Sequence, residues 1–168
     1  EFIRINHSIA VAAALAIFTP AGLEIQTGGF KVDYTPVFGD TIDLQRFAEL
    51  GKKGVMALLC DSTNVERPGY TMSERTVGKT FDTIFADNPN SRIIVATFAS
   101  NVDRVQQIIN SAVKYHRKVV IEGRSMVNIV TTAKELGYIS MPDNVLIDIE
   151  NIKNYTDEQL VLITTGSQ

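Results

Sequence analysis

The stretch Val55-Met56-Ala57-Leu58-Leu59-Cys60-Asp61-Ser62-Thr63-Asn64 is an apolar run that ends abruptly in one carboxylate and three small polar residues. Such a run predicts a strand that is buried on both faces, with helices packed above and below it. Asp61 then lies at the carboxyl end of the strand. In open α/β sheets ligands bind at that end, because loops and helix N-termini converge there.

The composition is typical of a globular chain with one sizeable core. Of the 168 residues, 45% are hydrophobic and 21% are charged. The formal net charge of −3 excludes a global electrostatic footprint for nucleic acid, so any RNA contact must come from a local groove. The single cysteine, Cys60, cannot form an intrachain disulfide. We expect it to be a small core residue, which fits a reducing cytoplasm.

The segment Ile9–Phe18 is rich in small apolar residues but is too short to span a bilayer, and no basic region precedes it. We therefore expect no membrane partner. Because the chain begins with Glu1 inside an expected strand and stops directly after another, both ends are expected to be cut.

The first part of the chain is expected to be rich in β-structure. Glu1–Ile5 alternates polar and apolar residues as a half-buried strand does, and Ala10–Thr19 with Leu23–Thr27 predicts an antiparallel hairpin. Ile42–Leu50 places apolar residues on one helical face.

Behind Asp61 the pattern alternates between strand and helix. Such alternation predicts a parallel, right-handed βαβ sheet. The expected strands are 92–98, 118–121, 145–149 and 160–164, and the expected helices are 73–86, 100–115 and 125–136, with Ser73, Ser100 or Asn101, and Ser125 as their N-caps. The fold class is therefore α/β.

Polar residues directly follow four of the expected strands, and on one parallel sheet these tips would share an edge. Small residues and free helix amides at such an edge would let a phosphate approach the backbone, and two arginines add charge. The alternative is that the hydroxyl and amide residues only cap helices. Neither a Walker nor a GxGxxG spacing is present, so an ordinary nucleotide site is weakly supported. The candidate phosphate-binding residues are Ser62, Thr63, Asn64, Ser100, Asn101, Arg104, Gly123, Arg124, Ser125 and Ser167.

Several short motifs in register make the sequence similar to bacterial ribonuclease J. That family belongs to the metallo-β-lactamase superfamily and carries an inserted β-CASP domain. The resemblance covers essentially the whole chain. The motifs are His7-Ser8-Ile9, Thr27-Gly28-x-Phe30-Lys31, Asp61-Ser62-Thr63-Asn64, Pro68-Gly69-x-Thr71-x-Ser73-Glu74, Thr97-Phe98-Ala99-Ser100-Asn101, Gly123-Arg124-Ser125-Met126 and Thr164-Thr165-Gly166-Ser167-Gln168.

The resemblance implies a two-metal nuclease, usually with zinc or else manganese, that cleaves RNA between two domains. It implies that residues 1–60 are a partial metallo-β-lactamase section with a β-hairpin. Residues 61–168 would be a partial β-CASP domain with a Rossmann-like parallel sheet and helices on both faces. His7 corresponds to a metal ligand, and Asp61 to the acidic residue of the first β-CASP motif, which gives it a candidate catalytic role.

The chain departs from the family pattern where the chemistry is most demanding. Gly29 stands where the family has a metal-bridging aspartate, and Asp103 stands where relatives often carry histidine. The family's His-x-His-x-Asp-His cluster is absent. Because a catalytic zinc normally needs three protein ligands, we expect no metal to be bound by this chain alone.

Three readings follow from these residues. The first is a part of a ribonuclease J-like RNA hydrolase without a complete active site. The second is a module that binds RNA without cleaving it, and the third is an engineered or selected folding fragment. Unpaired strand edges and the apolar surface of Ala10–Phe18 also predict a homo-oligomer.

Overall fold

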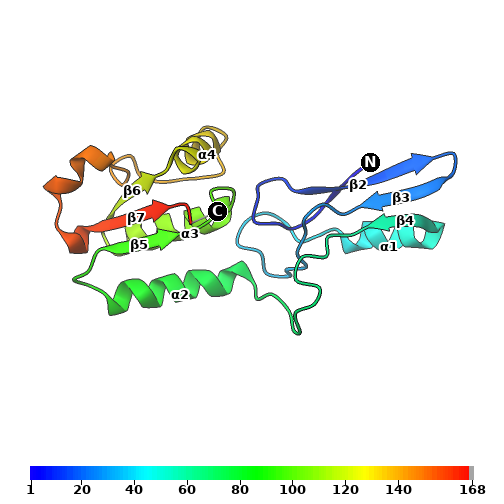
Figure 1. The fold of residues 1–168 in the computed structure, drawn as a ribbon, viewed down its shortest axis with the longest axis horizontal. Helices are drawn as coiled ribbons and strands as arrows, with labels where there is room; N and C mark the ends of the chain where they lie inside the picture. The colour runs from blue at the N-terminus through cyan, green and yellow to red at the C-terminus, as the bar shows by residue number, and fades with distance from the viewer. Residues whose placement is uncertain (167–168) are drawn as a thin grey trace. The chain divides into compact units, whose positions relative to one another are not determined.

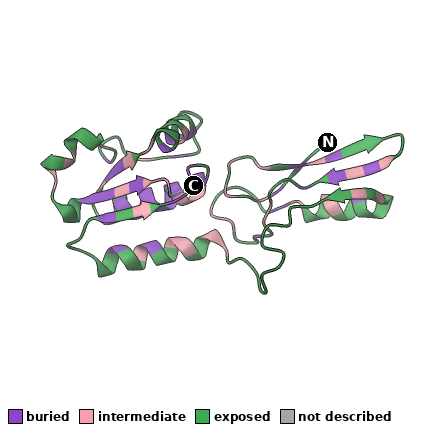
Figure 2. Ribbon diagram, viewed as in Figure 1, coloured by how far each residue is buried: buried purple, intermediate pink, exposed green. Residues whose placement is uncertain are grey.

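The computed structural model describes residues 1–166. The chain divides into two compact units between Ser73 and Glu74, which we call unit 1 and unit 2. Each unit has a hydrophobic core of its own, and the two clusters of described residues share no member. Figure 2 shows buried residues within the sheet of each unit.

Unit 1 is built on a four-stranded sheet in the order β1-β2-β3-β4 (Figure 1). Strands β1 (Phe2–Arg4), β2 (Ala13–Thr19) and β3 (Gly22–Gln26) pair antiparallel in sequence order. The predicted hairpin is confirmed, with Thr19 opposite Gly22 across the turn. Strand β4 (Val55–Leu59) then pairs parallel to β3 after a crossover through helix α1 (Leu44–Lys53).

Helix α1 begins and ends at recognisable capping residues. The Asp43 carboxylate accepts a hydrogen bond from the Arg46 amide at 2.9 Å. At the other end Gly54 has a φ of 88°, which a glycine adopts without strain. The core of unit 1 gathers alternate residues of the sheet with Ile42 of the preceding segment and Leu50 of the helix. Its buried members are Ile3, Ile5, Ala14, Ala16, Leu23, Ile25, Ile42 and Leu50.

The prediction that Val55–Leu59 is buried on both faces is wrong. Strand β4 is the end strand of its sheet, and Met56 and Leu58 are 58% and 60% exposed. Val55, in contrast, packs against the core of unit 1. The prediction that Cys60 is a core residue is wrong for the same reason, since its side chain is exposed. In this chain the unbroken apolar run therefore forms an end strand, and only one of its faces packs against the core.

Unit 2 contains a three-stranded parallel sheet in the order β5-β7-β6. Strand β7 (Leu160–Thr164) is central and pairs with both β5 (Ile93–Ala96) and β6 (Lys118–Glu122). The predicted strand at 145–149 is not formed. Leu146 makes one isolated bridge to Val119, and a 3-10 helix, η1, covers Ile149–Asn154. A shorter one, η2, covers Asp157–Gln159.

Three helices pack against this sheet, namely α2 (Glu74–Asp87), α3 (Val102–Lys114) and α4 (Arg124–Glu135). Their apolar side chains form one cluster with alternate residues of the strands, such as Ile93, Val119, Val161 and Ile163. A parallel sheet flanked by helices confirms the predicted α/β fold class. Among the described residues, no helix is both long and apolar enough to cross a membrane.

Candidate functional site

Asp61 directly follows β4 and organises its own loop. Its Oδ1 accepts hydrogen bonds from the Thr63 amide at 3.0 Å and the Thr63 hydroxyl at 2.7 Å. These bonds hold the pKa of the Asp61 carboxyl below its usual value, the hydroxyl bond contributing most. The Asp61 amide in turn donates to the buried Thr27 hydroxyl at 3.0 Å. The carboxylate therefore acts as the acceptor of a tight turn that places Ser62, Thr63 and Asn64 on the surface.

His7, Gly29 and Asp61 converge in unit 1 although they are far apart in sequence. A Cβ atom at Gly29 would stand 2.9 Å from His7 Nε2 and 3.8 Å from Asp61 Oδ2. The imidazole thus lies in space that a side chain at position 29 would fill. Position 29 lies between the predicted metal ligand and the predicted acidic residue.

The donor set around His7 does not fit the metals that the family resemblance implies. A catalytic zinc normally takes three protein ligands. Among residues 1–166, no group of three or more His, Cys, Asp or Glu side chains is arranged to hold a metal ion. His7 and Asp61 supply two possible donors, and Gly29 supplies none.

In unit 2 the carboxyl ends of the three parallel strands meet at one edge. The Thr97 amide, after β5, donates to the Thr164 carbonyl of β7 at 3.0 Å. Gly123, after β6, lies beside Thr165, whose Oγ1 would be 3.5 Å from a Cβ atom at that glycine. We call this the strand edge of unit 2. The expectation that the Asp61 loop shares the same sheet is wrong, because β4 belongs to the sheet of unit 1. Ser167 lies outside the described residues.

At this edge, the N-terminus of α3 is satisfied by the chain itself. The Asn101 side chain accepts from the Arg104 amide at 3.1 Å, and the Asn101 carbonyl accepts from the Val105 amide at 3.1 Å. Asn101 is buried, whereas Ser100 is exposed and stands just outside the helix. Of the two residues predicted as the N-cap, Asn101 is therefore the cap.

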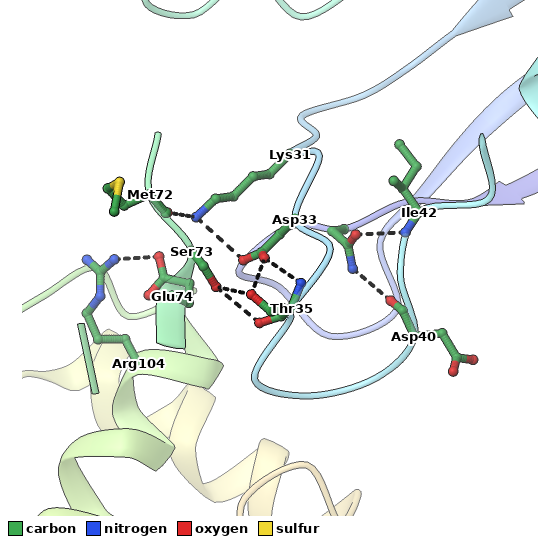
Figure 3. A network of polar contacts seen from close by, with 10 residues as sticks. Lys31, Asp33, Thr35, Asp40, Ile42, Met72, Ser73, Glu74 and Arg104 are labelled. Carbon is green, nitrogen blue, oxygen red and sulfur yellow. Dashed lines mark hydrogen bonds and ion pairs between the residues drawn. The ribbon is translucent and has the colours of Figure 1, made fainter. Parts of the chain in front are cut away.

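Arg104 does not present a free guanidinium. Its Nη2 lies 2.7 Å from Oε1 of Glu74 at the start of α2, as Figure 3 shows. The same figure shows Lys31 reaching the Met72 carbonyl and Ser73 bonded to Thr35 within unit 1. Arg104 therefore comes to the edge with much of its charge already neutralised.

The N-terminus of α4 is different, because Gly123 occupies the cap position and provides no side-chain hydrogen bond. The prediction that Ser125 is the N-cap is wrong, since it lies inside the first turn. Arg124 and Ser125 are both exposed. Arg124 also lines a cavity of about 710 Å³ with Lys134 and three acidic residues, Glu122, Asp148 and Glu150.

Sequence reasoning missed two threonines of the strand edge. Thr97 is only 6% exposed, and its hydroxyl has no hydrogen-bond partner among the described residues. Thr165 lies against Gly123, as described above. Both directly follow strands, so their position in the sequence was the signal that could have identified them.

Comparison with known proteins shows which family this sequence resembles. Residues 90–168 match the family model of the ribonuclease J β-CASP domain. The whole chain is 48% identical to the ribonuclease J of Synechocystis and 47% identical to that of Helicobacter pylori strain 26695. The predicted resemblance to ribonuclease J is confirmed. The match favours the first of the three readings over the binding module and the engineered fragment.

The similarity covers only part of these relatives. The chain spans 26% of the Synechocystis ribonuclease J and 24% of the Helicobacter one. A crystal structure of a protein of unknown function from Enterococcus faecalis V583 has a similar fold. Its TM-score is 0.63 at 19% identity, with 99% of this chain and 41% of that chain covered.

Proposed function

We propose that this chain is part of a ribonuclease J-like, metal-dependent RNA hydrolase, and that it contributes a phosphate-binding surface for RNA. The observation that carries this proposal is an identity of 40–48% to proteins named ribonuclease J along the whole chain. In this proposal residues 1–60 belong to a metallo-β-lactamase section and residues 61–168 to a β-CASP domain. A cytoplasmic location is part of the same proposal.

The α4 end of the strand edge offers a phosphate an uncapped helix N-terminus and the exposed Arg124, in a cavity that three carboxylates also line. Gly123 lets a phosphate approach the first amides of α4, where the helix dipole favours an anion. The exposed Arg124 can pair with a phosphate oxygen, and the Ser125 hydroxyl can donate to one. Ser100, Asn101 and Arg104 at α3, together with Ser62, Thr63, Asn64 and Ser167, are further candidates with weaker support.

Hydrolysis would need divalent cations, zinc or manganese by the family resemblance, which activate a water and stabilise charge on the phosphate. His7 and Asp61 would be the contributions of this chain to such a site. Because the described residues supply only these two donors, we expect the 168-residue chain not to cleave RNA by itself.

The experiment measures binding of a fluorescent single-stranded RNA to the chain over a range of salt concentrations. Arg124→Gln is expected to weaken binding about three- to ten-fold and to reduce the salt slope by about one. Arg92→Gln is the control at the opposite end of the parallel sheet, where Arg92 precedes β5 and pairs with Asp157. Equal losses for both variants, or no binding at low salt, would contradict the proposed surface.

Cleavage is measured on the same RNA with added zinc or manganese and with a chelator as control. We expect no cleavage by this chain. Chelator-sensitive cleavage would instead mean that the missing ligands are supplied in another way, for example across an interface between copies.

We also propose that the isolated chain self-associates through the exposed side of β4. Met56 and Leu58 form an apolar surface on an end strand, which is the kind of edge that pairs between chains. Sedimentation at micromolar protein concentration should show an oligomer, and a monomer alone would exclude this proposal.

A further inference from the structure

Strand β5 carries an exposed apolar stripe on one face of the sheet of unit 2. Successive side chains of a strand point to opposite faces of the sheet. Ile93 and Val95 pack with the helices in the core of unit 2, whereas Ile94 and Ala96 are exposed on the other face. Phe98 continues this series just beyond the end of β5 and is 61% exposed. We call Ile94, Ala96 and Phe98 the open stripe of unit 2.

The rest of this face is increasingly covered away from β5. The strand register places Leu162 of β7 beside Ile94, and Val120 of β6 beside Leu162. Val120 is fully buried and Leu162 is half-buried, whereas Ile94 is exposed. The open part of the face therefore follows β5 and ends at the strand edge with Phe98.

The backbone on both sides of the Phe98 ring is held in place. The Thr97 amide donates to the Thr164 carbonyl at 3.0 Å, and the Phe98 carbonyl accepts from the Asn101 amide at 3.0 Å. Within residues 1–166, the Phe98 ring makes no contact with another aromatic ring or with a cation. A ring on a fixed backbone can bind a flat ligand at a low entropic cost, because few rotatable bonds remain to be ordered.

The position of Phe98 suits a nucleobase of a bound RNA strand. Aromatic side chains stack on bases of any sequence, because every base has a π-face. Phe98 and Gly123 follow the two outer strands of the sheet, on either side of β7, so two strand spacings of about 10 Å in total separate these strand ends. A short single strand with a phosphate at the N-terminus of α4 can therefore present a base to Phe98.

We propose that Phe98 is a base-stacking residue, through which unit 2 selects single-stranded over double-stranded RNA. This inference rests on the proposed RNA-binding function and names the class of RNA that the surface takes. The bases of a duplex are paired and stacked on one another, so they offer no free face to the ring. The ring is uncharged, so this selection does not depend on the balance of charges along the strand edge.

The first test measures binding of a fluorescent single-stranded RNA and of the matching duplex. Phe98→Ala should weaken binding of the single strand about ten-fold and change binding of the duplex by less than about two-fold. Phe98→Leu should weaken binding of the single strand nearly as much, because it keeps an apolar side chain but has no ring.

Phe18→Ala is the matched control, because Phe18 is also an exposed phenylalanine, at 56%, and belongs to unit 1. It lies beside Leu23, which pairs with Val55 at the start of β4, so it stands at the opposite end of that strand from Asp61. Phe18→Ala should leave both RNA affinities unchanged.

A second measurement reports stacking directly. The chain contains no tryptophan, so Phe98→Trp introduces a single indole at the open stripe. This variant should bind the single strand at least as tightly as the unchanged chain, and its fluorescence should be quenched when a base stacks on the indole.

The inference is overturned if saturating single-stranded RNA leaves this fluorescence unchanged, or if Phe98→Ala binds the single strand as tightly as Phe18→Ala does. In both cases RNA binding by the unchanged chain would still support the proposed function. If the unchanged chain binds neither RNA, the proposed function fails and this inference fails with it.

Discussion

At position 29 a side chain would compete with the His7 imidazole for the same space. We expect Gly29→Asp to displace the imidazole and to place a third donor beside His7 and Asp61. Affinity for zinc or manganese, measured by titration calorimetry, should rise at least about ten-fold above that of the unchanged chain.

The matched control for this prediction is Gly29→Asn, which has nearly the same size and lacks the charge. It should not reproduce the gain in affinity for manganese, which prefers carboxylate oxygen ligands. His7→Ala in the unchanged chain should leave metal affinity as it is. If the unchanged chain already binds metal as tightly as Gly29→Asp, the view that this donor set does not fit a metal is wrong.

Single residues also show which contacts could not be predicted from the sequence. The motif order identified His7, Gly29 and Asp61 as a group, because each could be matched to a family position. It could not show that the imidazole lies against Gly29, since that depends on how β1, β3 and β4 are brought together. Likewise the positive charge of Arg104 was predicted, but its pairing with Glu74 depends on the packing of α2 against α3.

At the scale of one element, Asn101 and Ser100 differ in whether they cap helix α3. Asn101→Ala should destabilise unit 2 by about 1 kcal/mol, because the Arg104 amide loses its acceptor. Ser100→Ala should cost close to nothing, since Ser100 is exposed and stands outside the cap. Chemical denaturation followed by circular dichroism measures both. Equal losses would mean that the two residues share the capping role.

Helices and strands behind Asp61 were predicted well because their signals are local. Apolar periodicity and the polar residues between elements located α2, α3, α4, β5, β6 and β7. The segment 145–149 was assigned wrongly, because its apolar residues pack beside β6 with only a single bridge at Leu146. Strand pairing is a long-range property, so a short apolar run does not show whether a ladder forms.

At the scale of the whole chain, the sequence likewise did not show which strands share a sheet. The carboxyl end of β4 resembles those of β5, β6 and β7 in sequence, with small polar residues after an apolar run. Nothing local indicates that β4 pairs with β3 in another sheet. The α/β class followed from the alternation of expected strands and helices, whereas the division into two sheets depends on which strands pair.

Two separate cores predict that the two units lose structure independently. Leu50 and Ile108 are both fully buried, and each belongs to the core of a different unit. Leu50→Ala should destabilise unit 1, and Ile108→Ala unit 2, each by about 2 to 5 kcal/mol, because each leaves a cavity. Amide hydrogen exchange followed by mass spectrometry should show faster exchange only in the unit that carries the substitution. Faster exchange throughout both units in either variant would show that the chain unfolds as one cooperative body, in spite of its two cores.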